Sequence, residues 1–161
     1  MSLALVRVDD RLVHGQVVVG WAQALAADHV VLVDDRIRAS DWERELYNLA
    51  MPPGLKLTIA SVAEALGNVR EWISAPARTI LVTAQVSTIV ALSEAEPGIT
   101  QVNVGGMHSG EGREERLAYV FMSAGEAEMF RRLETRGVSV SAQDVPTARA
   151  VPLRDLVGIP A

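Results

Sequence analysis

Residues 3–16 read LALVRVDDRLVHGQ, and this stretch predicts both the fold class and the site of the chain. Its first six residues are largely apolar and predict a strand, and the apolar periodicity of Val17 to Ala26 predicts a helix after it. The turn between them holds Arg11 and, three residues later, His14 beside Gly15. A helix start offers free N–H groups and a positive dipole end, arginine a planar charge, and histidine a nitrogen nucleophile. The stretch therefore predicts a turn that binds a phosphoryl group and carries it on His14.

Short β-rich runs alternate with helical runs through the rest of the chain. Strands are expected at Leu3–Val8, His29–Val33, Leu55–Ala60, Thr79–Thr83, Thr100–Val104, Leu117–Met122 and Val138–Ala142. Three pairs match the capping box of a helix start: Ser40 with Glu43, Ser61 with Glu64, and Ser123 with Glu126. Repeated βα units predict one domain over residues 1–161, a three-layer α/β/α fold with a mainly parallel central sheet of about six to seven strands.

Composition excludes several classes of function. A net charge of −5 and an aromatic content of 4% disfavour a nucleic-acid binder. The chain has no cysteine, which rules out disulfides and thiolate metal sites and is compatible with a reducing cytoplasm. Its longest apolar stretch, Val17 to Ala27, contains Gln23 and is too short to span a bilayer. We therefore expect a soluble domain that reaches a membrane only through a partner.

The three histidines are His14, His29 and His108. His29 opens an apolar strand, and we expect it to be structural. His108 follows a glycine-rich segment after a strand, so the loop of residues 105–113 is expected at the same sheet edge as His14. A zinc site is disfavoured because the histidines lack ligand spacing and Arg11 would repel a cation. No mononucleotide fingerprint and no G-x-S-x-G motif is present, which disfavours nucleotide binding and serine hydrolysis.

The segment RVDDRLVHGQV at residues 7–17, followed by Trp21, resembles the phosphorylation-site segment of one family of enzyme IIB components. That family is the mannose/sorbose class of the bacterial phosphoenolpyruvate:sugar phosphotransferase system. Three further segments look like the same family: MPPG at residues 51–54, VNVGGM at 102–107 and TRGV at 135–138. One departure lies after Met107, where several family members carry basic residues and this chain reads HSGEGREER, mixed in charge.

The resemblance implies a cytoplasmic histidine phosphocarrier. His14 would accept phosphate on Nδ1 from a phosphorylated IIA protein and pass it to a sugar held by membrane IIC/IID components. Arg11 would be the phosphate partner, supported by Asp10, Gly15 and Gln16. Asp9 and Asp10 are also expected to orient Arg11 and cap the turn. No metal or separate cofactor is expected beyond the covalent phosphohistidine.

Two other functions stay open at this point. The first is a regulatory phosphoprotein of an incomplete phosphotransferase system, which uses the same His14 but moves no sugar. The second is a generic α/β small-molecule binder that is never phosphorylated. The oligomeric state is also open. An apolar seam on the first helix (Val17, Trp21, Ala24, Leu25) is expected to face the core rather than a second copy.

Overall fold

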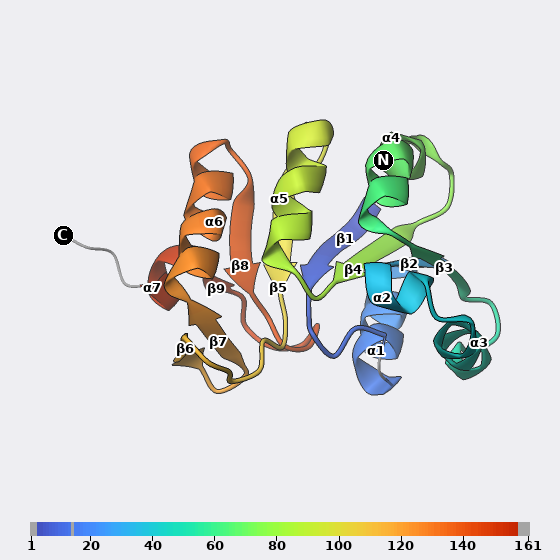
Figure 1. The fold of residues 1–161 in the computed structure, drawn as a ribbon, viewed down its shortest axis with the longest axis horizontal. Helices are drawn as coiled ribbons and strands as arrows, with labels where there is room; N and C mark the ends of the chain where they lie inside the picture. The colour runs from blue at the N-terminus through green and yellow to red at the C-terminus, as the bar shows by residue number, and fades with distance from the viewer. Residues whose placement is uncertain (1–2, 14, 158–161) are drawn as a thin grey trace.

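The computed structural model describes residues 3–13 and 15–157, and of residues 15–17 the backbone alone. The elements are β1 (Leu3–Val8), α1 (Gly15–Leu25), β2 (His29–Val33), α2 (Asp35–Arg38), α3 (Asp41–Ala50), β3 (Lys56–Ala60), α4 (Val62–Ser74), β4 (Thr79–Thr83), α5 (Val86–Ala95), β5 (Gln101–Val104), β6 (Arg113–Leu117), β7 (Val120–Ser123), α6 (Ala124–Thr135), β8 (Ser139–Ala142), β9 (Val151–Pro152) and α7 (Leu153–Val157). Figure 1 shows them in space.

The main sheet has seven strands in the order β3-β2-β4-β1-β5-β8-β9. The first six are parallel, and β9 pairs antiparallel with β8. Every residue of β2 and β4 is buried, which explains why both strands are apolar almost throughout. The predicted three-layer fold with a mainly parallel sheet is confirmed.

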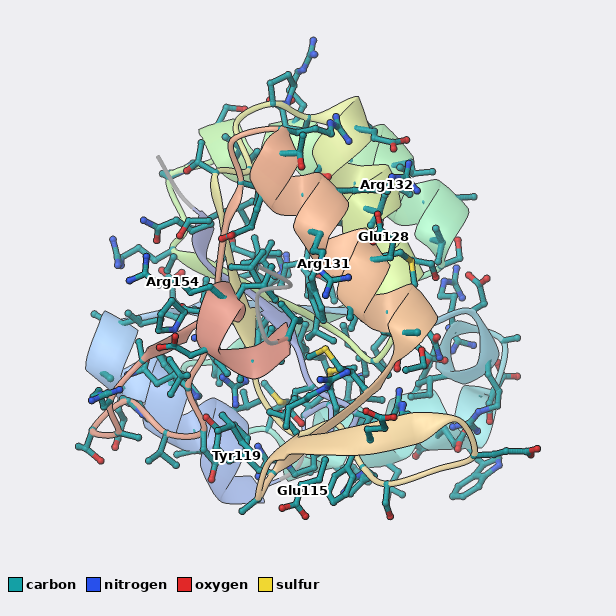
Figure 2. The ribbon with its side chains drawn as sticks, turned by 90° about the vertical axis from the view of Figure 1, so that its left-hand side faces the viewer. Glu115, Tyr119, Glu128, Arg131, Arg132 and Arg154 are labelled. Carbon is teal, nitrogen blue, oxygen red and sulfur yellow. The ribbon has the colours of Figure 1, made fainter. Side chains whose placement is uncertain are left out.

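Helices cover the two faces of the sheet unequally (Figure 1). On one face, α4, α5, α6 and α7 pack over a continuous core that includes Phe130, Leu92 and Leu133. Figure 2 shows α6 along this side, with the charged side chains Glu128, Arg131 and Arg132 on it. The other face carries α1, α2 and α3 over a smaller core.

Helix α1 turns a slightly different side inward from the one expected. Its buried side chains are Val18, Trp21 and Ala22, whereas Ala24 is exposed. The seam was therefore wrong at Ala24, because the inward positions follow the i, i+3, i+4 spacing from Val18.

The predicted helix starts are confirmed in position. Ser61 and Ser123 each form a full capping box with Glu64 and Glu126. Ser40 accepts a hydrogen bond from the Glu43 N–H, which fixes the start of α3. These bonds satisfy N–H groups that lack partners within the helix.

The expected strand Leu117–Met122 was wrong. This region forms an antiparallel hairpin, β6 with β7, in a separate two-stranded sheet. The charged residues of β6, REERL, suit a partly exposed ribbon and not a central strand, while Val120 and Met122 of β7 are buried in the core. The hairpin is joined to the main body at Met107, whose N–H and carbonyl bond to Tyr119 and Phe121.

The order in which the chain adds strands to the sheet reverses beside the central strand β1. Strands β2 and β3 lie on one side of β1, and β5 and β8 lie on the other. In parallel α/β sheets, ligands bind beyond the carboxyl ends of the strands at such a point. None of the helices in the described part of the chain is long and apolar enough to cross a bilayer.

Candidate functional site

A tight turn follows β1 at the carboxyl edge of the sheet. The Leu12 N–H donates to the Asp9 carbonyl at 3.0 Å, and Leu12 has a positive φ of 56°. A leucine in this left-handed region costs roughly 1–2 kcal/mol. Leu12 and its neighbour Val13 are both buried in the core beneath α1, so apolar packing holds the strained turn in place.

Asp9 is fully buried and organises the turn. Arg11 donates to both of its oxygens, from Nε to Oδ1 at 3.0 Å and from Nη2 to Oδ2 at 2.9 Å. Arg7 donates to Oδ2 from Nη2 at 3.0 Å. Burial acts to raise the pKa of Asp9, but the hydrogen bonds from Arg11 and the charges of both arginines outweigh it and hold that pKa below its usual value.

Arg7 is a buried arginine on the central strand, and the sequence interpretation missed it. It donates to the Asn103 side chain, to the Gln143 carbonyl at 2.8 Å and to the Asp144 carbonyl at 2.9 Å. Its guanidinium also lies 5.0 Å from the centre of the Trp21 ring. Burial lowers its pKa, and Asp9 offsets part of that effect. Arg7 thereby ties β1 to β5 and to the segment after β8.

Arg11 is held from two sides. Besides the bonds to Asp9, its Nη2 lies 2.8 Å from Asp144 Oδ1, and the pKa of Arg11 is raised chiefly by the hydrogen bond to Asp9. Three of its five side-chain N–H groups thus donate hydrogen bonds. Among residues 3–13 and 15–157, no group accepts a hydrogen bond from Arg11 Nη1. The side chain is 27% exposed. Arg11 is therefore aligned in advance, with Nη1 left for an anion.

Two glycines after β5 make room for these arginines. A Cβ on Gly105 would lie 2.2 Å from Arg7 Nη2 and 2.4 Å from Asp9 Oδ2. A Cβ on Gly106 would lie 2.7 Å from Arg11 Nε. The pair is needed because the backbone passes directly over the two guanidinium groups.

The loop of residues 105–113 borders the same turn, as expected. The Asp10 N–H donates to the Gly106 carbonyl at 2.9 Å, and the Asp10 carboxylate accepts from the His108 N–H at 2.8 Å. His108 Nδ1 lies 2.6 Å from Asp10 Oδ1. Arg113 donates to the His108 carbonyl at 2.8 Å and pairs with Glu126 at 2.8 Å. Asp10 therefore joins the two loops.

His14 lies outside the described residues, and the structure describes only the backbone of Gly15 and Gln16. Helix α1 begins at Gly15, directly after His14 in sequence. The first turn of a helix has N–H groups without intrahelical partners. The described part of the site thus combines a helix start, an aligned arginine and the Asp10–His108 pair at one edge of the sheet.

His29 lies at the opposite edge, at the start of β2. It is buried, its Nε2 is 2.7 Å from Thr58 Oγ1, and burial lowers its pKa. These contacts fit the structural role expected of it. The described residues also contain no group of three or more side chains that could hold a metal ion.

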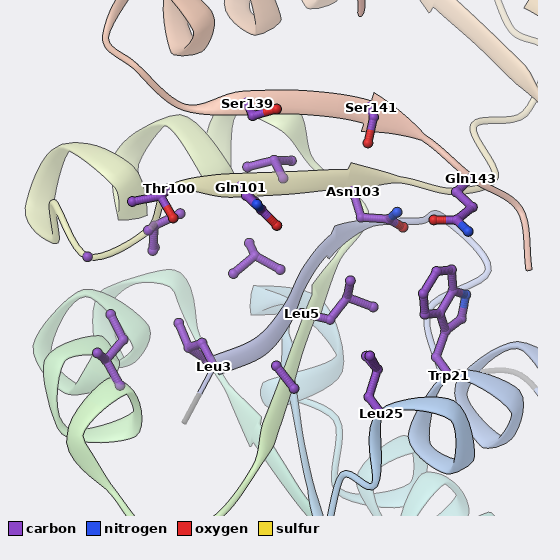
Figure 3. A pocket seen from close by; sticks show the side chains of 16 residues that line it. Leu3, Leu5, Trp21, Leu25, Thr100, Gln101, Asn103, Ser139, Ser141 and Gln143 are labelled. Atoms are coloured by element: carbon purple, nitrogen blue, oxygen red, sulfur yellow. The ribbon is translucent and has the colours of Figure 1, made fainter. Parts of the chain in front are cut away.

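A cavity of about 470 Å³ lies on the sheet face that α1 covers in part (Figure 3). Amide and hydroxyl side chains of β5 and β8 line one side, and Leu3, Leu5 and Leu25 line the other. Two of the lining residues, Asn103 and Gln143, also bond to Arg7. The cavity thus reaches the inner side of the arginine network, away from the turn surface.

The fold and this edge define an α/β domain in which two aspartates hold an arginine in place in the turn after the first strand. Residues 3–160 match the family model described as "PTS system sorbose subfamily IIB component". The chain therefore belongs to the sorbose subfamily of IIB components of sugar phosphotransferase systems, and the predicted family is confirmed.

Individual relatives agree with this assignment. The chain is 29% identical over 147 residues to the sorbose-specific EIIB component of Lacticaseibacillus casei, covering 91% of this chain and 90% of the relative. It is 29% identical over 157 residues to the mannose-specific EIIAB component of Escherichia coli K12, covering 98% of this chain. It spans about half the length (49%) of that relative.

Solved structures show the same fold. The crystal structure of the N-acetylgalactosamine-specific IIB component 1 from Escherichia coli has a TM-score of 0.87 at 30% identity, covering 93% of this chain and 98% of that one. The IIB domain of the sorbose permease from Klebsiella pneumoniae has a TM-score of 0.89 at 24% identity, covering 100% and 99%, and supports the fold alone.

Proposed function

We propose that this chain is a histidine phosphocarrier of sugar uptake. His14 accepts a phosphoryl group on Nδ1 from the phosphohistidine of a IIA protein. It then delivers the group to a sugar held by membrane IIC/IID components, and the exchange takes place in the cytoplasm. Relatives are named for mannose, sorbose and N-acetylgalactosamine, so a hexose is the class of sugar to test first.

The alignment of Arg11 is the observation that carries this proposal. A phosphoryl group in transfer spreads its charge over three equatorial oxygens and needs fixed donors more than covalent help. Arg11 is fixed by Asp9 and Asp144 and keeps Nη1 free among the described residues. The start of α1 supplies backbone N–H groups next to it. In the sequence, Arg11 precedes His14 and the first residues of α1 follow it directly.

The transfer balances without a further reactant. The Nδ1 lone pair of His14 attacks phosphorus as the N–P bond to the donor histidine breaks, and the donor nitrogen regains its lone pair. In the second step a sugar hydroxyl oxygen attacks the same phosphorus, the His14 N–P bond breaks, and the hydroxyl proton leaves to a base or to water. Arg11 and the helix N–H groups hold the phosphoryl oxygens in both steps.

Phosphorylation of His14→Ala tests the assignment directly. The protein is incubated with phosphoenolpyruvate, enzyme I, the phosphocarrier protein and a cognate IIA, and its intact mass is measured. The wild type is expected to gain one phosphoryl group, and His14→Ala none, while His29→Asn and His108→Gln still gain it. A phosphorylated His14→Ala protein would show that His14 is not the acceptor.

A further inference from the structure

Strands β5 and β8 carry polar side chains on one face of the main sheet. Gln101 and Asn103 of β5 lie in register beside Ser139 and Ser141 of β8. A parallel sheet ordinarily has helices over both of its faces. Among the described residues, however, the core under α1, α2 and α3 contains no residue of β5 or β8. This part of the sheet borders the cavity of about 470 Å³ instead (Figure 3).

Two amide side chains at the cavity are held at one end and free at the other. Asn103 Oδ1 accepts from Arg7 Nη1, and because arginine has only donors, the other end of this amide is the donor Nδ2. Gln143 Nε2 donates to the carbonyls of Pro146 and Ala148, at 3.2 and 2.8 Å, which leaves Oε1 as an acceptor. Within residues 3–13 and 15–157, neither Nδ2 nor Oε1 has a hydrogen-bond partner. The cavity wall thus holds one oriented donor and one oriented acceptor.

The rest of the lining is polar on one side and apolar on the other. Gln101, Ser139 and Ser141 add an amide and two hydroxyl groups to the polar wall, and in the described part of the chain none of these side chains bonds to another residue. The opposite wall consists of partly buried leucines: Leu3, Leu5 and Leu25. None of the described side chains that line the cavity is charged.

We propose that this cavity binds a neutral polyhydroxyl molecule of the monosaccharide or sugar-alcohol class. A hydroxyl group both donates and accepts, so hydroxyls of one molecule can bond to Asn103 Nδ2 and to Gln143 Oε1 while its C–H groups pack against the leucines. A charged molecule would lose its hydration without gaining an opposite charge, and a hydrocarbon would leave the amide ends without partners. The volume lies within the range of small-molecule sites, roughly 300–1,000 Å³.

The cavity is separate from the phosphocarrier turn. Arg7 lies between the two, because it bonds to Asn103 on one side and on the other to Asp9, which holds Arg11. None of the described residues that line the cavity takes part in the proposed phosphoryl transfer. Binding in the cavity therefore does not depend on the proposed function of His14, and His14→Ala is expected to bind D-mannose or sorbitol as the wild type does.

Side-chain amide resonances measure binding in the cavity directly. The ¹⁵N-labelled chain is titrated with D-mannose and with sorbitol, and the Gln101, Asn103 and Gln143 amides are followed by NMR. At least one of the two probes is expected to shift these resonances to saturation, with a Kd on the order of 1 mM. Cyclohexanol, which has a ring and a single hydroxyl, is the control probe and is expected to bind at least about 10-fold more weakly.

Three variants test whether the probe occupies the cavity. Ser141→Leu places an apolar side chain in the polar wall and is expected to weaken binding of the same probe by at least about 10-fold. Ser87→Leu is the matched control, since it makes the same change at an exposed position of α5, on the other face of the sheet, and should bind like the wild type. Gln101→Leu keeps the side-chain size at an exposed position, removes the amide, and is expected to weaken binding by about 3- to 10-fold.

The proposed site is overturned if neither D-mannose nor sorbitol shifts the three amides up to about 50 mM, or if cyclohexanol binds as tightly as they do. It is also overturned if Gln101→Leu binds the probe like the wild type, and this variant decides the question should Ser141→Leu fail to fold. The phosphocarrier assignment is judged separately: a wild type that gains no phosphate would overturn that assignment and leave the result for the cavity unchanged.

Discussion

Replacing Arg11 by lysine tests whether the turn needs a planar cation. The guanidinium makes three charge-assisted hydrogen bonds at once, two to Asp9 and one to Asp144, and keeps Nη1 for the phosphoryl group. A lysine ammonium is a single point on a flexible stem and cannot hold both aspartates and a phosphate in one plane. The variant therefore keeps the charge and loses the alignment.

The expected losses of transfer rate and of stability follow from the hydrogen bonds that a lysine cannot form. Losing one charge-assisted contact to the phosphoryl group is worth about 1.5–3 kcal/mol, which lowers the transfer rate by about one to two decades. Asp9 is fully buried and keeps Arg7, so we expect the free energy of unfolding of Arg11→Lys to fall by about 1–3 kcal/mol, short of global unfolding.

The assay is the rate of phosphoryl transfer from phosphorylated IIA, measured by rapid quench and intact mass at a temperature where both proteins are folded. Urea unfolding gives the stability difference. Arg36→Lys is the control, because Arg36 is 72% exposed and its ion pair is with Glu43 and not with a residue of the turn. Its transfer rate is expected to match the wild type, with stability within about 0.5 kcal/mol. Wild-type transfer by Arg11→Lys would mean that Arg11 only supports Asp9 and does not act on phosphate.

Three further changes test the supporting structure. Gly105→Ala places a Cβ 2.2 Å from Arg7 Nη2 and is expected to lower the free energy of unfolding by about 3–5 kcal/mol in urea, whereas Gly110→Ala, whose Cβ meets only Arg113 Cδ at 3.9 Å, is expected to change little. The pKa of Asp9 is lowered in the folded protein, so the ionised carboxylate stabilises the fold at pH values above its unfolded pKa of about 4. This stabilisation is lost as the pH falls through the pKa of Asp9 in the folded protein. Asp9→Asn is therefore expected to be less stable than the wild type by about 3–5 kcal/mol at pH 7, a gap that narrows below about pH 4; a constant gap across that range would contradict the ionised Asp9. Ser61→Ala removes one half of the capping box of α4 and is expected to cost about 1 kcal/mol by thermal unfolding, and no loss would show that Glu64 alone caps the helix.

The strands of the central sheet were predictable because burial on both faces leaves a continuous apolar run. The expected bounds of β1, β2 and β4 are those observed. The hairpin was not predictable in the same way, since residues 113–117 are mostly charged and the apolar residues after them read as one strand. A short two-stranded ribbon outside the main sheet buries only one of its faces, so the apolar pattern in its sequence is weak.

The turn itself was predictable because its residues are neighbours in the chain. Arg11, Asp9 and Asp10 lie within three positions, and the structure confirms that Asp9 orients Arg11. Asp144 was missed, since it is 133 positions from Arg11 and no local pattern marks it. Arg7 was missed because an arginine within a strand ordinarily indicates a solvent-facing position.

One local signal for the buried network was present in the sequence. In β1 the side chains alternate between the two faces, so Arg7 shares a face with Leu5 and with Asp9. An arginine and an aspartate two positions apart, on one face of a central strand, predict a buried pair once the strand is known to be central. That knowledge comes only from the strand order, which places β4 and β5 on either side of β1.

The glycines after β5 complete the account of how this site is organised. In the sequence they form a glycine-rich segment after a strand, and the structure gives the space beside them to the guanidinium groups of Arg7 and Arg11. The cation of the turn is thus aligned from three segments: Asp9 on its own loop, Asp144 after β8, and the bare backbone of Gly105 and Gly106. Because a side chain at either glycine would displace an arginine and not a ligand, substitutions there should alter the site through the aspartate–arginine network before they alter any direct contact with phosphate.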